Sequence, residues 1–187
     1  MSNTIVTYKL FNYKDGKLYP LYVNADKHLP IGEWISAECG ELLPSGKVKA
    51  KIGNGLSFRP GFHSQENYAI ALHIGKKAHS TDTKPSFRPK NQVWCKCLIH
   101  NDNGYWQEKA NNAGKCSRDK CLKEVPINGF YRYKTNPNMF GEWCISGELF
   151  IEKILSDEEV KEINGKFGVS DLPREEWGNN VKITTSY

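Results

Sequence analysis

Short apolar runs rich in β-branched and aromatic residues open the chain. The runs "NTIVTYKLF" and "KDGKLYPLYV" are separated by a turn at Asp15 and Gly16, a residue pair typical of two-residue hairpin turns. We therefore expect a β-hairpin. Its second strand should end at Pro20 or lie at a sheet edge, because proline cannot donate to a strand ladder. A further run, "IGEWISAEC", follows them.

Alternation of side chains is strongest in "QVWCKCLIH", residues 92–100. The odd-numbered side chains from Val93 to Ile99 share one face of a strand, and the even-numbered ones from Trp94 to Leu98 share the other. Two later segments, "FYRYKTN" and "GEWCISGELFI", predict further strands. We expect the second of them to be the last central strand.

A helix near the C-terminus has the clearest local signal. Ser156 and Glu159 have the spacing of a capping box, in which each side chain accepts a hydrogen bond from the other residue's backbone. Leu155 and Val160 occupy the positions of a hydrophobic staple. Val160, Ile163 and Phe167 then form the inner face of the predicted helix, and Gly165 lies near its end.

A second, shorter helix is expected to begin at Ser64 or Gln65. Tyr68 and Leu72 fall on one of its faces, and Gly75 is placed to end it.

Polar stretches predict the long connections. Residues 40–61 predict an exposed loop or a loose hairpin, and residues 101–121 predict a long polar loop. Many short strands with two short helices predict an α+β fold with a mainly antiparallel sheet. We expect one domain over residues 1–168. A polar tail over 169–187 follows, in which "VKITTSY" could add an edge strand.

Composition adds expectations about environment. No apolar run among the 187 residues approaches a membrane span, and the N-terminus lacks the basic and apolar regions of a signal peptide. We therefore expect a cytoplasmic protein with no membrane contact, whose six cysteines are reduced. The net charge of +5 suits an anionic partner without requiring one.

Cysteine and histidine side chains gather between residues 95 and 121. Cys95 and Cys97 alternate with apolar residues in a predicted strand, where we expect them to be small core residues. The spacing lacks the C-x2-C pair of common zinc sites. Cys116, Cys121 and His100 could still hold zinc. The alternative is that they are ordinary loop and core residues.

The segment "FYRYKT" combines aromatic and basic residues. Tyr131 and Tyr133 share one face of the predicted strand, and Arg132 and Lys134 share the other. Aromatic rings on a sheet can stack on single-stranded bases while cations follow the phosphates. An ordinary edge strand with one solvated face has the same pattern, so both interpretations remain open.

Glu142 and Glu148 lie in or beside a predicted buried strand, where charged residues are rare unless they are paired or functional. Glu142 is either a reaction carboxylate or a polar residue at a strand start, paired with Lys134 or Arg132. Glu148 is expected to face water.

His63 lies between a Pro-Gly corner and the predicted short helix, where side chains often face a cleft. Arg59 lies beside the same cleft. We interpret both as binding groups and not as catalysts.

Two family resemblances follow from longer strings. The set "YKLF…DGKLYPLYV…PIGEW…RPGFH…GFYRYKTNP…GEW.I.GE…ILSDEEV" resembles a family of small phage and mobile-element proteins over most of the chain. Three blocks in order, "RPGFHSQENYAIAL", "NQVWCKCLI" and "GEWCISGELFIEKIL", resemble the ADP-ribosyltransferase fold in its diphtheria-toxin and poly(ADP-ribose) polymerase branch.

The second resemblance implies a split or strongly bent antiparallel sheet with NAD in its cleft. Glu142 matches the catalytic glutamate, which stabilises an oxocarbenium-like transition state. His63 takes the place of the aromatic residue that stacks on nicotinamide, and Ser64 begins the following helix. Asn12 or Tyr13 stands where the family has a histidine that holds the adenosine ribose.

The leading hypothesis is therefore a phage or mobile-element protein with an NAD-binding, ADP-ribosyltransferase-like domain that acts on a host macromolecule. The alternative is a non-enzymatic module that binds a host protein or nucleic acid through its basic loops.

Overall fold

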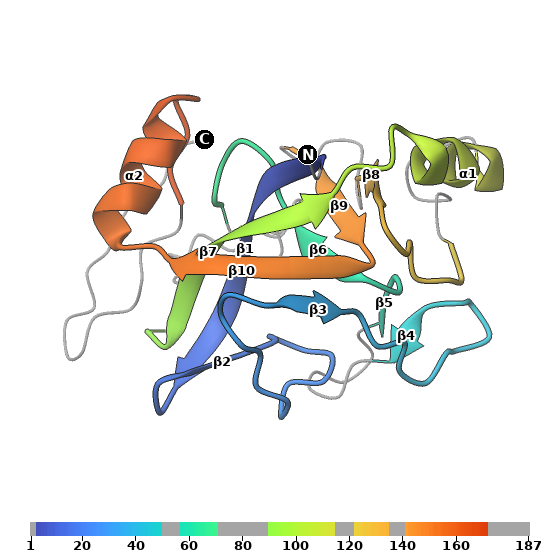
Figure 1. Cartoon of the computed structure of the whole chain (residues 1–187), viewed down its shortest axis with the longest axis horizontal. Coiled ribbons are helices and arrows are strands. Elements are labelled where there is room, and N and C mark those ends of the chain that lie inside the picture. Colours follow the sequence, from blue (N-terminus) through green and yellow to red (C-terminus); the bar gives the residue numbers. More distant parts are fainter. Residues whose placement is uncertain (1–2, 50–56, 71–89, 115–121, 135–140, 172–187) are drawn as a thin grey trace, which may run out of the picture.

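The computed structural model describes residues 3–49, 57–70, 90–114, 122–134 and 141–171. The described strands form antiparallel sheets, accompanied by two helices (Figure 1). The α+β class with mainly antiparallel pairing is therefore confirmed.

The largest sheet has five strands in the order β2-β1-β7-β10-β3. Their bounds are β1 Thr4–Lys14, β2 Lys17–Tyr19, β3 Trp34–Ser36, β7 Gln92–His100 and β10 Glu148–Ile154. Asp15 and Gly16 have φ values of 51° and 75°, which a tight hairpin turn between β1 and β2 requires. The predicted hairpin is confirmed, and β2 ends directly before Pro20.

A second sheet has the order β6-β9-β8, with bounds Phe62–Ser64, Trp143–Ser146 and Phe130–Tyr133. Gly147 alone separates β9 from β10, so consecutive residues pass from one sheet into the other. The prediction of one central strand in "GEWCISGELFI" is therefore wrong: the segment forms two strands in two sheets.

Two short strands form a third sheet. Val48–Lys49 is β4 and Ser57–Phe58 is β5, and they pair antiparallel. The predicted loose hairpin over 40–61 is confirmed at its base, and residues 50–56 lie outside the described part.

The main core lies between the two larger sheets. The odd-numbered side chains of β7 point into it, joined by Phe11, Leu149 and Ile151 of the large sheet and Phe130 and Cys144 of the smaller one. The predicted division of residues 92–100 into two faces is confirmed, because Trp94 belongs to a separate cluster on the opposite face.

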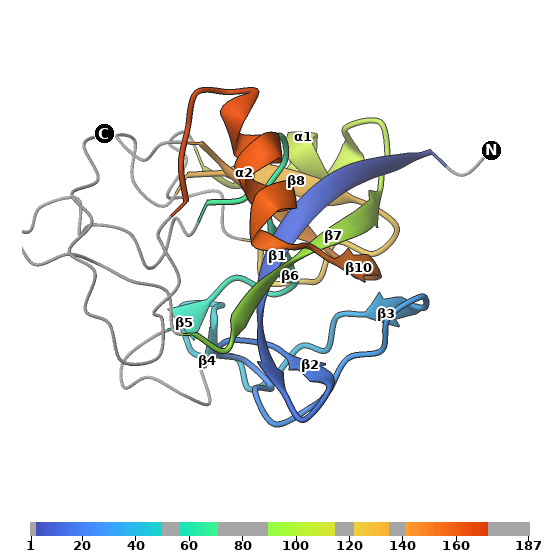
Figure 2. The same ribbon diagram turned by 90° about the vertical axis from the view of Figure 1, so that its left-hand side faces the viewer.

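Helix α2, Asp157–Gly165, covers that opposite face (Figure 2). Leu155 and Val160 pack there with Trp94, as the staple predicts. The capping box is confirmed: Ser156 Oγ accepts from the Glu159 backbone at 3.2 Å, and the Glu159 carboxylate accepts from the Ser156 backbone at 2.9 Å.

Helix α1, Tyr105–Ala113, lies within the stretch expected to be a polar loop. Trp106 and Ala110, one helical turn apart, are buried against Tyr131 and Tyr133 of β8. Figure 1 shows α1 and α2 at opposite ends of the molecule. Neither described helix is long and apolar enough to cross a membrane.

The prediction of a helix starting at Ser64 or Gln65 is wrong over residues 64–70. Ser64 ends strand β6, and Gln65 forms a bridge with Tyr8 through two backbone hydrogen bonds of 2.7 and 2.9 Å. The backbone is extended there because β1 supplies pairing partners. Leu72, Gly75 and the tail segment "VKITTSY" lie outside the described residues.

Candidate functional site

Glu142 is exposed and directly precedes β9. Its negative charge shifts the pKa values of three neighbouring side chains. Burial is the main cause that raises the pKa of Tyr68 and of the Cys144 thiol, and the negative charge of Glu142 adds to both. Glu142 also contributes to the raised pKa of Arg132, whose main cause is a hydrogen bond to Glu66.

Arg132 and Glu66 form a two-pronged ion pair that sequence reasoning missed. Arg132 Nε and Nη2 donate to the two Glu66 carboxylate oxygens at 2.6 and 2.9 Å. The Cys144 thiol donates to the same carboxylate at 3.6 Å. Among the described residues, the ion pair of Arg132 is therefore with Glu66 and not with Glu142, while pairing of Glu142 with Lys134, the other partner considered, stays a prediction. No sequence signal marked Glu66, because its segment resembled a helix.

His63 is half-buried among aromatic rings. Its ring centroid lies 5.8 Å from Phe58, 5.9 Å from Trp143 and 6.0 Å from Tyr133, edge to face in each case. Arg59 is buried, with its guanidinium 3.7 Å from the centroid of the Tyr133 ring. The structure thus brings Arg59 and His63 together through Tyr133.

The neighbours of His63 and of Glu142 lie on opposite faces of the smaller sheet. Trp143, which contacts His63, belongs to the cluster under α1, whereas Cys144 faces the main core. Successive side chains along a strand point to opposite faces of the sheet, so the side chains of Trp143 and Cys144 point to opposite faces. Glu142 acts on the side of Cys144 and not on the side of the His63 ring.

Ser64 and Asn12 are also separated. Ser64 is fully buried opposite Cys144, and its hydroxyl has no hydrogen-bond partner among the described residues. Asn12 pairs with Gln92 and Tyr19 in the large sheet. It lies four residues, or about 13 Å of strand, beyond the bridge residue Tyr8. These two predicted binding residues do not share one pocket.

His100 stacks on Trp34, with ring centroids 3.9 Å apart and planes inclined by 12°. Cys116 and Cys121 lie outside the described residues. In the part of the chain that the structure describes, no three His, Cys, Asp or Glu side chains gather as metal ligands. The described cysteines, Cys39, Cys95, Cys97 and Cys144, are free thiols.

Tyr131 and Tyr133 do not face solvent, with exposed fractions of 0% and 4%. The prediction that these rings stack on nucleic-acid bases is therefore wrong, because α1 and its neighbours cover them. Most of the basic stretch from 76 to 90 lies outside the described residues.

Lys9 is a half-buried cation that sequence reasoning also missed. Its Nζ donates to the His63 carbonyl oxygen at 2.7 Å, which links β1 to β6 between the sheets. Burial lowers the pKa of Lys9 to about 8, although the nearby Cys97 and Cys95 thiols oppose this shift. Lys9 lies two residues before Phe11 and so on the same face of β1, and this spacing could have indicated from the sequence that it faces the core.

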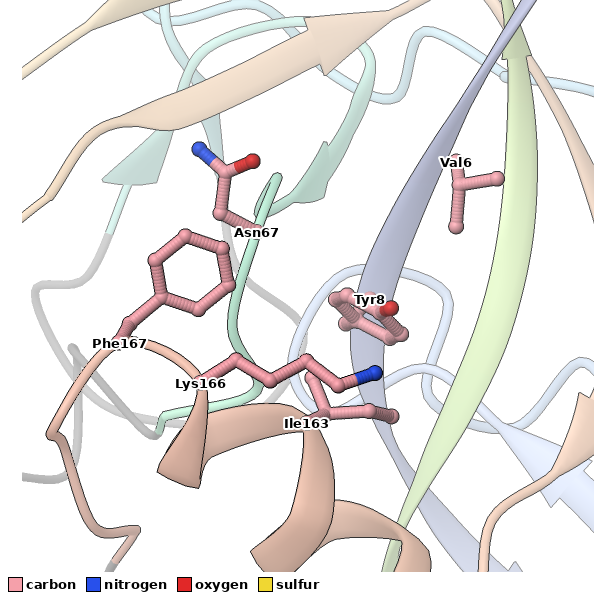
Figure 3. Close-up of a pocket in the computed structure, with 6 residues that line it drawn as sticks. All are labelled: Val6, Tyr8, Asn67, Ile163, Lys166 and Phe167. Carbon is pink, nitrogen blue, oxygen red and sulfur yellow. The ribbon is translucent and has the colours of Figure 1, made fainter.

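An open groove of about 220 Å³ lies between β1 and the end of α2 (Figure 3). Its lining residues are Val6, Tyr8, Asn67, Ile163, Lys166 and Phe167. The Lys166 side chain extends across Ile163 toward Tyr8, and Phe167 lies near Asn67 (Figure 3). Burial raises the pKa of Tyr8, so its hydroxyl stays protonated and can donate a hydrogen bond.

The groove combines apolar contact area with one cation. Phe167 lies beyond the end of α2 and is 50% exposed, so its predicted place on the inner face of the helix is wrong, and Val6 is 40% exposed. Lys166 forms no ion pair with any described residue. Among the residues that the structure describes, this lining offers apolar and polar binding contacts and includes no carboxylate, thiol or imidazole.

Comparison with known proteins gives no relative: no family model, no curated protein and no solved structure matches this chain.

Proposed function

We propose that this protein is a non-enzymatic binding module that holds an apolar side chain of a partner protein in the groove between β1 and α2. The observation that supports this proposal most is the groove itself, where exposed Phe167 and Val6 lie beside Lys166, a cation with no ion pair among the described residues. If the chain is encoded by a phage, as the first resemblance implies, the partner is a host protein.

The size of the groove supports one side chain over a whole cofactor. Pockets for drug-sized ligands occupy about 300–1,000 Å³, and a dinucleotide is larger than most such ligands. The groove offers about 220 Å³. A single aromatic or leucine side chain fits this space and buries apolar area against Ile163 and Phe167.

Charge supports an acidic partner segment. Lys166 borders the groove, the chain carries a net charge of +5, and the described part of the lining contains no carboxylate. A partner carboxylate next to the anchoring side chain would meet the Lys166 ammonium. A partly exposed pair of this kind contributes about 1 kcal/mol, or about fivefold in affinity.

Two small probes test the proposal by nuclear magnetic resonance titration. N-acetyl-Phe-Asp-amide is expected to shift the backbone signals of Val6, Tyr8, Ile163 and Phe167. N-acetyl-Phe-Lys-amide should bind more weakly. Lys166→Ala should weaken the first probe about fivefold, whereas Lys161→Ala, exposed on the same helix, should not. Equal binding of both probes, or shifts that avoid the groove, would contradict the proposal.

A second candidate is the NAD-dependent ADP-ribosyltransferase that the second resemblance implies. The exposed Glu142 carboxylate beside Tyr68 and Arg132 favours it. In that reaction the bond from ribose C1′ to the nicotinamide nitrogen breaks and nicotinamide leaves. An oxygen or nitrogen of the target then bonds C1′ and gives up its proton. Glu142 would stabilise the positive charge on the ribose.

Release of nicotinamide from NAD tests this candidate without knowledge of the target, because water can replace the target as nucleophile. Wild-type release that falls at least about 100-fold in Glu142→Gln would support it. Glu158→Gln, an exposed position in α2, is the matched control. Equal release by wild type and Glu142→Gln, or none by either, would remove Glu142 from this role.

A further inference from the structure

Strand β3 forms one edge of the five-stranded sheet among the described residues. The Ala37 backbone N–H donates to the Gly147 carbonyl at 2.7 Å, which fixes the hydrogen-bond register with β10. In an antiparallel ladder the backbone groups of alternate residues point to opposite sides. Ile35 therefore faces β10, and the N–H and C=O groups of Trp34 and Ser36 point outward from the edge.

Trp34 places a supported aromatic ring at this edge. It is 42% exposed, although it stacks on His100 at 3.9 Å and contacts the Phe150 ring at 5.6 Å. Ile31, just before the strand, is 47% exposed. A ring held in place by two neighbours loses little conformational freedom on binding, so it is a preorganised apolar contact.

The edge is acidic, in contrast with the whole chain. Residues 31–41 contain Glu33, Glu38 and Glu41 and no lysine or arginine, whereas the chain has a net charge of +5. Lys27 pairs with Glu38. Glu33 and Glu41 are exposed and form no ion pair with any residue that the structure describes.

We propose that the β3 edge binds a basic, extended segment of a partner protein as an added sheet strand. The outward N–H and C=O groups of Trp34 and Ser36 pair with the segment backbone. An apolar side chain of the segment covers Trp34, and a lysine or arginine meets Glu33. The acidic edge repels phosphates, which favours a peptide over a nucleic acid. Figures 1 and 2 show β3 away from α2, so this site is independent of the groove.

Fluorescence anisotropy tests the proposal with a labelled peptide, acetyl-Thr-Lys-Val-Arg-Ile-Lys-Thr-amide. Ser36→Pro removes one outward N–H and leaves the ladder with β10 intact, since proline is tolerated on edge strands whose N–H faces solvent. We expect it to weaken binding at least tenfold. Ser36→Thr keeps the N–H and should stay within twofold. Glu33→Lys and Trp34→Ala should each weaken binding about fivefold or more.

Three controls sharpen the test. Thermal melts must show that Ser36→Pro is folded, and Glu33→Lys provides a second test that leaves the backbone unchanged. Lys166→Ala should leave peptide binding at the wild-type level, which separates this site from the groove. Equal binding by Ser36→Pro and Ser36→Thr, or tighter binding of an acidic peptide or of oligo(dT), would overturn the proposal. Self-association of the chain that Ser36→Pro abolishes would overturn it too, since a second copy would then be the occupant.

Discussion

The side-chain amide of Asn164 forms two hydrogen bonds with the backbone of Ala69. Its Oδ1 accepts from the Ala69 N–H at 2.7 Å, and its Nδ2 donates to the Ala69 carbonyl at 2.9 Å. Both residues are buried, with exposed fractions of 1% and 0%. The Asn164 side chain of α2 therefore supplies Ala69, 95 residues away in sequence, with the two backbone hydrogen bonds that a neighbouring strand would otherwise provide.

Asn164→Ala should lower the free energy of unfolding by about 2–4 kcal/mol. It leaves a buried N–H and a buried C=O without partners, and each unsatisfied group costs about 1–3 kcal/mol. Denaturant unfolding measures the change. Asn112→Ala, at an exposed position of α1, is the control and should change the stability by less than about 0.5 kcal/mol. Similar values for both variants would show that the Asn164 bonds do not stabilise the fold.

The lowered pKa of the half-buried Lys9 predicts that the folded chain becomes more stable at alkaline pH. Its pKa is about 8 in the folded chain, against an ordinary value of 10.5. Between these two values the unfolded chain binds more protons than the folded one, so the free energy of unfolding rises with pH across this window. The full shift corresponds to about 3 kcal/mol.

Lys9→Met should remove this rise and should be more stable than wild type at pH 7 by about 1–2 kcal/mol. The gain is smaller than the full shift because the His63 carbonyl loses its donor. Urea unfolding at pH 7, 8, 9 and 10 measures both effects. Lys17→Met, at the exposed start of β2, should keep the wild-type slope. A flat wild-type profile would contradict burial of the Lys9 ammonium.

The described thiols should differ widely in reactivity. Burial raises the pKa of Cys95 to about 12 and holds those of Cys97 and Cys144 well above their ordinary value. At pH 8 the thiolate fraction of Cys95 is about a thousandfold below that of an unperturbed cysteine. Iodoacetamide labelling followed by peptide mass spectrometry should therefore modify the exposed Cys39 first. Rapid labelling of Cys144 in the folded chain would contradict the packing around Glu66.

Gly147→Ala should destabilise the fold by about 1–3 kcal/mol, the typical cost of overpacking. An added Cβ would lie 2.4 Å from the Pro126 carbonyl oxygen and 2.7 Å from its carbon, and backbone atoms cannot easily move away. Gly165→Ala is the control, because its added Cβ would meet nothing within 4 Å. Thermal unfolding that ranks the two variants equally would show that the corner between β9 and β10 can relax.

Local chemistry made part of the fold predictable. The β1–β2 hairpin depends on Asp15 and Gly16, and α2 depends on the cap at Ser156, so adjacent residues contain the whole signal. The break at Gly147 carries no such signal, because "WCISGELFI" has a continuous strand pattern. Glycine is needed at this position because Pro126, distant in sequence, occupies the space that a side chain would need.

The candidate site was less predictable, because its contacts join distant segments. Arg132 and Glu66 are 66 residues apart, and the rings around His63 come from three strands other than its own. Identifying Glu142, His63 and Arg59 as polar residues of interest needed only the sequence. Which face of the sheet each residue joins depends on strand pairing, which no local pattern specified.

The junction at Gly147, where the chain passes from one sheet to the other, also restricts where residues can be inserted or deleted. Strand faces alternate with every residue, so one residue inserted between Ser146 and Glu148 would exchange the two faces of β10. Leu149 and Ile151 would turn outward, and the charged Glu148 would turn into the core. Insertions and deletions in homologous sequences should therefore accumulate in the loops and spare this junction.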